Sequence, residues 1–351
     1  MTTAPPPPAR LVLRMPNWLG DAVMALPAAA AVRAAFPDTA IAIAAPASVA
    51  PLFEENTPAR QDQLISIARR EHEAADVRVG SFDAALLLPN SFRSAWVARQ
   101  AGIGERWGYA AGLRGFLLTR AVKRPVERFH QSAYYLALVR SLGLPAADKM
   151  PSVTVRPETL RSAHELLASR GLHADDLLVG FAPGAAYGHA KRWPTARVAE
   201  LVTRVSRERG ATSVLVGVAG DRDAGREIES LLPPDARLVN LIGRTDLRQL
   251  AGVLARCRAF VSNDSGAMHL AAAIGVPVAA IFGPTDDRVT SPLGNTDVLI
   301  HQVFCRPCML RDCPIDHRCM KGITVEQVFA AVGNRLDATG QAGSRPEAGG
   351  P

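Results

Sequence analysis

Short apolar runs alternate with longer amphipathic stretches along the chain, a pattern typical of repeated strand–helix units that build a parallel sheet. In the first half this pattern predicts strands at residues 11–15, 41–45 and 84–88 and helices at 22–35 and 132–142. The third strand contains Leu86, Leu87 and Leu88 without a polar break, as expected of a strand buried on both faces. Pro27 predicts a late start or a kink in the first helix, because proline cannot donate to the carbonyl four residues earlier.

The second half repeats this alternation. It predicts strands at 177–182, 213–216, 259–262 and 278–282 and helices at 195–207, 222–232, 247–256, 266–274 and 324–336. A further helix at 157–169, with Pro157 suited to its first turn, joins the halves. The chain is therefore expected to be an α/β protein made of two Rossmann-like, doubly wound domains.

The expected domain organisation follows from these elements and from the polar, flexible composition of both ends of the chain. The boundary between the halves falls near residues 155–175. We expect a disordered tail at 1–9, an N-terminal domain at 10–165, a C-terminal domain at 166–323, a helix at 324–337 that can pack back on the first domain, and a disordered tail at 338–351.

The composition is that of a soluble globular protein. The chain has 351 residues, a length that suits two domains better than one hydrophobic core. Hydrophobic residues make up 48% of it and charged residues 21%. No run reaches the ~18 uninterrupted apolar residues that a membrane span needs. The first ten residues are rich in proline and lack the apolar segment of a signal peptide, so we expect a cytoplasmic protein.

The formal net charge is +7 with a pI near 9.5, which favours an acidic partner: nucleic acid, anionic lipid or a phosphorylated substrate. Nucleic-acid binding is disfavoured, because aromatic residues are only 5% of the chain and no recognition motif is present. For any single arginine, a solvated surface position is the ordinary outcome. Much of the excess charge lies in residues 91–130, as Arg93, Arg99, Arg106, Arg114, Arg120, Lys123, Arg124 and Arg128 against two acids.

The first motif, at residues 16–21, follows the first strand directly. Ligands of open parallel sheets bind beyond the carboxyl ends of the strands, so reactive groups belong in such a turn. Gly20 lets the backbone pass close to a ligand. Asp21 then stands near the start of a helix, where its carboxylate either caps free amides or serves catalysis, and its position alone does not distinguish these roles.

The second motif is the loop at 182–194, again after a strand. Its glycines, among them Gly184, allow the backbone amides to approach a phosphate, and Lys191 and Arg192 add positive charge. The loop matches neither a P-loop nor a dinucleotide-binding fingerprint. An ordinary surface loop is the alternative interpretation.

The third motif, at 262–269, ends a strand and opens an apolar helix. Asp264 and Ser265 are good N-cap residues, and Gly266 exposes the first helical amides, on which a diphosphate could sit. His269, one turn into the helix, could bind the same ligand or fill a structural role. A fourth turn, at 282–286 and containing Thr285, should face the same crevice.

Four of the five cysteines lie close together in the sequence: Cys305, Cys308, Cys313 and Cys319. Four thiols could bind zinc tetrahedrally, but their spacing matches none of the common zinc-ribbon patterns. Disulfides are disfavoured in the cytosol. We therefore favour reduced structural thiols over a structural zinc site.

Taken together and in this order, the motifs resemble those of bacterial lipopolysaccharide heptosyltransferases, and of heptosyltransferase II more than I. The resemblance covers residues 11–336. The segment at 88–94 and the cysteine-rich loop point to the second type. The resemblance is carried by segments 18–21, 88–94, 106–108, 183–194, 263–270 and 283–285 and by the cysteine cluster.

This resemblance implies a GT-B fold, with two Rossmann-like domains facing across a cleft, and an inverting transfer that requires no cofactor. The donor would be ADP-L-glycero-β-D-manno-heptose, bound by the C-terminal domain. The acceptor would be Kdo-lipid A already bearing one heptose, bound by the N-terminal domain at the cytosolic face of the inner membrane. We expect a monomer in peripheral contact with that membrane.

The resemblance also assigns residues. Asp21 takes the position of the general base, Lys191 contacts the donor phosphate and ribose, and Asp264 contacts the donor heptose. Ala186 and His189 depart from the family pattern, which puts the side-chain contacts of that loop in doubt. The further donor residues are Gly184, Ser265, Gly266, His269 and Thr285, and the acceptor residues are Asn90, Ser91, Arg93 and Arg106.

Two alternatives stay open. One is a transferase of the same family with another acceptor, such as heptosyltransferase I, which would differ in the number of heptoses that its acceptor carries. The other is a module that binds nucleotide sugar without catalysis, against which the presence of Asp21 argues.

Overall fold

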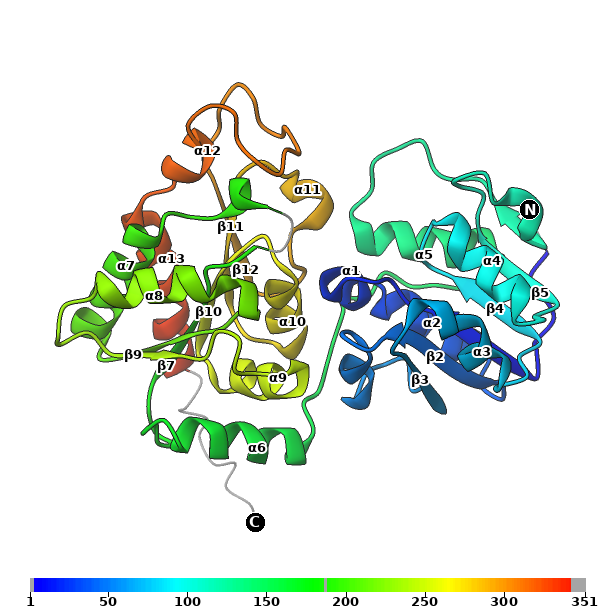
Figure 1. Ribbon diagram of the computed structural model, residues 1–351, viewed down its shortest axis with the longest axis horizontal. Helices are drawn as coiled ribbons and strands as arrows, with labels where there is room; N and C mark the ends of the chain where they lie inside the picture. The colour runs from blue at the N-terminus through cyan, green and yellow to red at the C-terminus, as the bar shows by residue number, and fades with distance from the viewer. Residues whose placement is uncertain (1–2, 186–187, 342–351) are drawn as a thin grey trace, which may run out of the picture. The chain divides into compact units, whose positions relative to one another are not determined.

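The computed structural model describes residues 3–185 and 188–341, and the chain divides into two compact units (Figure 1). The first unit comprises Met1–Arg156 with Arg288–Thr290, and the second comprises Pro157–Asp287 with Ser291–Pro351. Each unit contains a six-stranded sheet whose neighbouring strands are all parallel. The expected α/β fold of two Rossmann-like units is confirmed.

The sheet of the first unit has the strand order β3-β2-β1-β4-β5-β6. The order reverses between β1 (Arg10–Arg14) and β4 (Ala84–Leu87), so a ligand is expected beyond the carboxyl ends of these two strands. Helices α1, α2 and α5 pack together, and α3 packs with α4. The other elements are β2 (Ala40–Pro46), β3 (Gln63–Ile67), β5 (Glu105–Tyr109), β6 (Arg120–Val122), α1 (Leu19–Met24), α2 (Leu26–Ala35), α3 (Glu73–Arg78), α4 (Phe92–Gln100) and α5 (Gln131–Ser141).

The first predicted helix is split in two. Helix α1 ends at Met24, and α2 begins at Leu26 with Pro27 in its first turn. A proline in that turn lacks only an amide that would have no helical partner, so the chain starts a new helix there. The predicted kink is confirmed.

The sheet of the second unit has the order β12-β11-β10-β7-β8-β9, which reverses between β10 and β7. Helix α7 packs with α8 and α13, whereas α9 packs with α10 and α6. The elements are β7 (Leu178–Ala182), β8 (Thr212–Leu215), β9 (Leu238–Asn240), β10 (Ala259–Asn263), β11 (Val278–Phe282), β12 (Thr296–Ile300), α6 (Pro157–Ala168), α7 (Thr195–Arg209), α8 (Arg222–Ser230), α9 (Leu247–Arg256), α10 (Gly266–Ile274), α12 (Arg318–Lys321) and α13 (Val325–Gln341). The short helix α11 (Asp287–Thr290) has its first residue in the second unit and the other three in the first.

Strands β7, β10 and β11 are buried along their whole length, as the unbroken apolar runs predict. The sequence pattern did not reveal β3, β5, β6, β9 or β12. Strands β6 and β9 are only three residues long and have no fully buried residue, so they leave no apolar run to detect. The burial of β12 is intermediate throughout.

Both ends of the described chain depart from the expectation. Residues 338–341 continue α13, so this part of the predicted tail is helical, while 342–351 lie outside the described residues. Helix α13 packs on α7, β10 and β11 of the second unit. Pro5 is buried, and the Thr39 hydroxyl donates to the Pro8 carbonyl (2.7 Å), so the N-terminal segment packs on the first unit.

No helix among the described residues combines the length and the apolar character needed to cross a membrane.

Candidate active site

In the second unit, three loops that follow strands bring polar side chains together at the carboxyl edge of the sheet. Lys191 lies in the loop after β7, Asp264 follows β10, and Thr285 lies in the turn after β11. The strands that carry these loops are adjacent in the order β11-β10-β7. The sheet topology therefore places side chains from distant parts of the sequence side by side.

A buried ion pair joins two of the predicted donor residues. The Lys191 ammonium donates to Asp264 Oδ2 at 2.6 Å, and only 11% and 9% of the two side chains are exposed. The Thr285 hydroxyl donates to the same carboxylate oxygen at 2.7 Å. A desolvated charge pair of this kind is costly unless its geometry is good and other hydrogen bonds complete it. The arrangement presents a lysine, a carboxylate and a hydroxyl at one strand-end site.

Asn263 ties the two loops together. Its side-chain amide donates to the Pro183 carbonyl at 2.6 Å, and its oxygen accepts from the Trp193 amide at 3.2 Å. Trp193 is itself buried and donates its indole N–H to the Ile323 carbonyl at 3.0 Å. The loop that carries Lys191 is thus held at both ends against β10 and the start of α13.

The N-cap position of α10 was predicted correctly, but the capping hydrogen bond was not. Ser265 occupies the N-cap position, but its hydroxyl pairs with Ser262 Oγ at 3.0 Å and makes no capping hydrogen bond. Asp264 is held by Lys191 instead. The amides from Gly266 onward are therefore capped by neither of these side chains. His269 is buried one turn further along the helix.

Gly184 lies so close to another side chain that there is no room for a Cβ, a contact that the sequence did not reveal. A Cβ at this position would lie 2.2 Å from the Asp221 carboxylate. Asp221 is buried and pairs with Arg192 at 3.2 Å. Any side chain at Gly184 would displace this ion pair. Ala186, one of the two departures from the family pattern, lies outside the described residues, whereas His189 begins a short 3₁₀ helix, η4 (His189–Lys191).

The cysteine-rich loop contacts two of these strand-end turns. Arg306 donates to the carbonyls of Gly283 (2.8 Å) and Thr285 (3.2 Å) and pairs with Asp287 at 2.5 Å. The Arg311 carbonyl accepts from the Ala190 amide at 2.9 Å, next to Lys191. The loop therefore braces the turns that carry Thr285 and Lys191.

Cys319 lies within electrostatic range of the other three clustered thiols. Cys319 is buried, and this burial together with the nearby Cys305, Cys308 and Cys313 raises the pKa of its thiol. The Cys313 sulfur accepts from the His317 amide at 3.3 Å. Within the described parts of the chain, no group of three or more His, Cys, Asp or Glu side chains is arranged to hold a metal ion.

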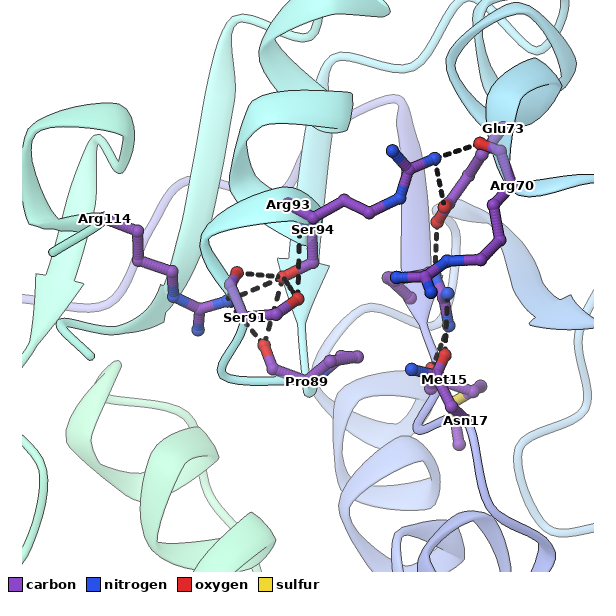
Figure 2. Close-up of polar contacts among 10 residues, drawn as sticks. Met15, Asn17, Arg70, Glu73, Pro89, Ser91, Arg93, Ser94 and Arg114 are labelled. Atoms are coloured by element: carbon purple, nitrogen blue, oxygen red, sulfur yellow. Dashed lines mark hydrogen bonds and ion pairs between the residues drawn. The ribbon is translucent and has the colours of Figure 1, made fainter. Parts of the chain in front are cut away.

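In the first unit, a cavity of about 380 Å³ opens where β1 and β4 end. Buried Glu73 organises its charge: it pairs with Arg14 Nε at 2.6 Å and with Arg93 Nη2 at 3.6 Å (Figure 2). Arg14 also donates to Asn17 Oδ1 at 2.9 Å. The lining residues include Arg14, Asn17, Trp18, Arg70, Glu73, Pro89, Ser91, Arg93 and Ser94. Three arginines and one carboxylate line this cavity, and this excess of positive charge suits an anionic ligand.

Asp21 lies in the first turn of α1, and its side chain is half-buried. Helix α1 packs on α5, which brings Asp21 to Tyr135. Burial raises the pKa of the Tyr135 hydroxyl, and the charge of Asp21 and a side-chain hydrogen bond to it add to the shift. The carboxylate thus has a hydroxyl neighbour from another helix.

The four predicted acceptor residues have different surroundings. Ser91 lines the cavity and caps α4, accepting from the Ser94 amide at 3.2 Å (Figure 2). Asn90 donates to the Tyr134 hydroxyl at 2.9 Å, and its buried side-chain oxygen has no hydrogen-bond partner among the described residues. The Arg106 guanidinium donates to the carbonyls of Leu117 (2.6 Å), Gly104 (2.8 Å) and Ile103, and Arg106 is not among the described residues that line this cavity.

Sequence reasoning missed Arg14, Glu73, Asp221 and Arg306. Arg14 is the last residue of β1, and a charged residue at that point was an available signal. Glu73 begins α3, a helix that was not predicted, and nothing in the sequence joins it to Arg14.

Comparisons with known proteins agree with this geometry. Residues 72–318 match the family described as Glycosyltransferase family 9 (heptosyltransferase). The chain is 33% identical over 299 residues to the lipopolysaccharide heptosyltransferase 2 of Salmonella typhimurium, covering 80% of this chain and 84% of that protein. Its similarity to the lipopolysaccharide heptosyltransferase 1 of Pseudomonas aeruginosa, 35% identity over 130 residues, covers only 35% of this chain and 34% of that protein.

The solved structure of the E. coli ADP-heptose LPS heptosyltransferase II is also similar, with a TM-score of 0.80 and 30% sequence identity. The alignment covers 94% of this chain and 99% of that one.

Proposed function

Because the chain belongs to glycosyltransferase family 9, the heptosyltransferases, it is a glycosyltransferase, and we propose that it moves L-glycero-D-manno-heptose from ADP-heptose onto the first heptose of the lipopolysaccharide inner core. The motif resemblance to heptosyltransferase II is confirmed. The type 2 relative aligns over most of both chains and the type 1 relative over about a third, which favours the acceptor that already carries one heptose.

The observation that carries the donor assignment is the buried set Lys191, Asp264 and Thr285 at the strand ends of the second unit. A nucleotide diphosphate would lie against the N-terminal amides of α10 from Gly266 onward, where the helix dipole favours negative charge. Lys191 would then turn from Asp264 toward the donor, and the freed carboxylate would accept from the sugar hydroxyls. Gly184, Ser265 and His269 are assigned to the same donor site.

The acceptor would bind in the first unit. Arg93 and the cavity that it lines offer positive charge to the anionic groups of a Kdo-lipid A acceptor. Ser91 lines the same cavity, and Asn90 precedes it in the chain. Since that acceptor is anchored in lipid, the enzyme would work at the cytosolic face of the inner membrane, as a monomer in peripheral contact with it. The transfer itself would need no metal or other cofactor.

In this reaction an acceptor hydroxyl oxygen attacks the anomeric carbon, the bond from that carbon to the diphosphate breaks, and ADP leaves with the electron pair. The attack comes from the face opposite the leaving group, so the anomeric configuration inverts. Asp21 takes the proton of the attacking hydroxyl.

The test is incubation of the purified protein with ADP-heptose and defined acceptors carrying no, one or two heptoses, read by mass spectrometry. Addition of a single heptosyl unit to the one-heptose acceptor alone is the expected result. Addition to the heptose-free acceptor would instead identify a heptosyltransferase I activity. Binding of ADP-heptose without turnover on any acceptor would identify a non-catalytic module.

A further inference from the structure

The outward face of α4 carries two aromatic residues where a surface helix is normally polar. Four residues of this helix are buried, Ser94, Ala95, Val97 and Ala98. The opposite face carries Phe92 and Trp96, which are 43% and 42% exposed. Their rings lie 6.3 Å apart and stack. Exposed aromatic residues at helical spacing mark a binding surface more often than an ordinary solvated one.

A neighbouring loop adds two more apolar side chains to this face. Phe116 is 72% exposed, with its ring 6.2 Å from that of Phe92, and Leu113 is 91% exposed. Leu113 has a φ of 58°, a left-handed conformation that costs energy for a branched residue. Leu113 is thus exposed to solvent in a backbone conformation that leucine disfavours. We call Phe92, Trp96, Leu113 and Phe116 the aromatic patch.

Buried Arg114 fixes this loop against the start of α4. It donates to the carbonyls of Pro89 (2.5 Å) and Ser91 (3.2 Å) and to Ser94 Oγ at 2.8 Å (Figure 2). Burial without a carboxylate partner lowers the pKa of this guanidinium to about 10. Because the buried Arg114 guanidinium bonds to these acceptors at the start of α4, it holds the loop in place, and the patch is therefore preorganised.

Exposed basic residues lie close to the aromatic patch in the sequence. Arg99 follows Trp96 on the exposed face of α4, and Lys123 and Arg124 are exposed in the segment before α5. Among the described residues none of these three forms an ion pair with a carboxylate; Arg124 lies 5.9 Å from the ring of Tyr134, whose hydroxyl accepts from Asn90. The next exposed apolar residue, Val126, is 92% exposed in the same basic segment.

We infer that the aromatic patch, together with the basic residues Arg99, Lys123 and Arg124, docks the first unit onto an anionic lipid surface. Aromatic side chains insert at the boundary between headgroups and acyl chains, and lysines and arginines beside them are attracted by anionic headgroups. Charge complementarity favours this occupant over a second copy of this basic chain, which would bring like charges together. The inference specifies the surface behind the proposed membrane contact, and it does not depend on which sugar is transferred.

The test is co-sedimentation of the full chain with vesicles of phosphatidylcholine alone or with phosphatidylglycerol. The natural chain should bind the anionic vesicles, and high salt should weaken binding. The double variant F92S/W96S and the loop variant L113S/F116S should each lower the fraction bound about tenfold or more. A matched control, V218S/L231S, removes two exposed apolar residues of the second unit and should bind normally. Melting temperature and ADP binding verify that each variant is folded.

Equal binding of the natural chain and both patch variants to anionic vesicles would overturn the inference, as would equal binding to vesicles without phosphatidylglycerol. A patch variant that changes only the oligomeric state in solution would assign the surface to self-association and would overturn it too. Turnover of a water-soluble, deacylated acceptor should be unchanged in the patch variants. Loss of vesicle binding with that turnover intact separates this inference from the proposed reaction.

Discussion

Lys191 and Asp264 lie 73 positions apart in the sequence, yet the lysine ammonium and the carboxylate meet at 2.6 Å in a buried position. Because β7 and β10 are neighbours in the sheet, the loops that follow them must emerge side by side. The resemblance of motifs assigned both residues to the donor, and the structure adds that they are partners of each other. A donor that binds here exchanges one buried pair for another set of charge-assisted contacts.

This pairing changes what a single substitution should do. Lys191→Ala should weaken ADP-heptose binding by about 1.5–3 kcal/mol, the worth of a charge-assisted hydrogen bond. It should also lower the melting temperature, because it leaves the Asp264 carboxylate buried without its cation. Isothermal titration with ADP-heptose and with ADP, together with thermal melting, separates the two effects.

The double variant K191A/D264A supplies the control. If the pair is only structural, the double variant should regain stability and bind donor normally, which would contradict the donor assignment. Arg207 and Asp235 form an exposed pair at 2.7 Å in the same unit, and Arg207→Ala should change neither donor binding nor melting.

Arg306 should act on the donor through the turn that it holds. Arg306→Ala frees the carbonyls of Gly283 and Thr285, so the KM for ADP-heptose should rise about tenfold while kcat at saturating donor changes little. Arg306→Lys keeps the charge but cannot reach both carbonyls, and it should restore part of the loss. Arg318→Ala, at an exposed pair with Asp316 in the same loop, is the matched control. A uniform loss of kcat with an unchanged donor KM would rule out this positioning role.

Most of the sheet architecture could be predicted, because buried parallel strands such as β7 and β11 leave unbroken apolar runs. The motifs at the strand ends could be predicted as well, because the end of each apolar run marks the end of a strand, and ligands of parallel sheets bind there. Which side chains pair with one another could not be predicted from the sequence. Arg106 is basic and lies in the expected segment, but its guanidinium donates its hydrogen bonds to backbone carbonyls. Glu73, which organises the arginine cavity, belongs to a helix with no sequence signal.

The cysteine loop should matter for stability more than for chemistry. Cys308→Ser should lower the melting temperature more than the activity per folded molecule, because the loop braces the turns without lining the reacting atoms. Cys319→Ser should be the more destabilising of the two, since Cys319 is buried and Cys308 only half-buried. Complete inactivity of a stably folded Cys308→Ser enzyme would contradict this. Stoichiometric zinc by elemental analysis would show that the thiols are metal ligands and not free.

Substitutions of Arg93 and Arg106 should have different effects on acceptor binding and on stability. Arg93→Gln should raise the acceptor KM several-fold with donor binding unchanged, and added salt should shrink the difference because it screens charge. Arg106→Gln should lower thermal stability without a specific effect on the acceptor KM. The comparison uses phosphorylated and dephosphorylated acceptors. Equal effects of Arg93→Gln on both acceptors would remove the phosphate explanation.

The decisive substitution is Asp21→Asn, which keeps the size and hydrogen bonding of the side chain and removes the base. If Asp21 accepts the proton of the acceptor hydroxyl, kcat should fall on the order of 10²-fold or more with little change in donor affinity. If the carboxylate only stabilises the start of α1, where it lies in the first turn, the variant should lose ~0.3–1 kcal/mol of stability and keep its kcat. Tyr135→Phe removes the hydroxyl that hydrogen-bonds Asp21 and serves as the structural comparison. It should cost stability but far less kcat than Asp21→Asn. Melting temperature and single-turnover rates on both variants distinguish the roles, and a destabilised but fully active Asp21→Asn enzyme would refute the catalytic assignment.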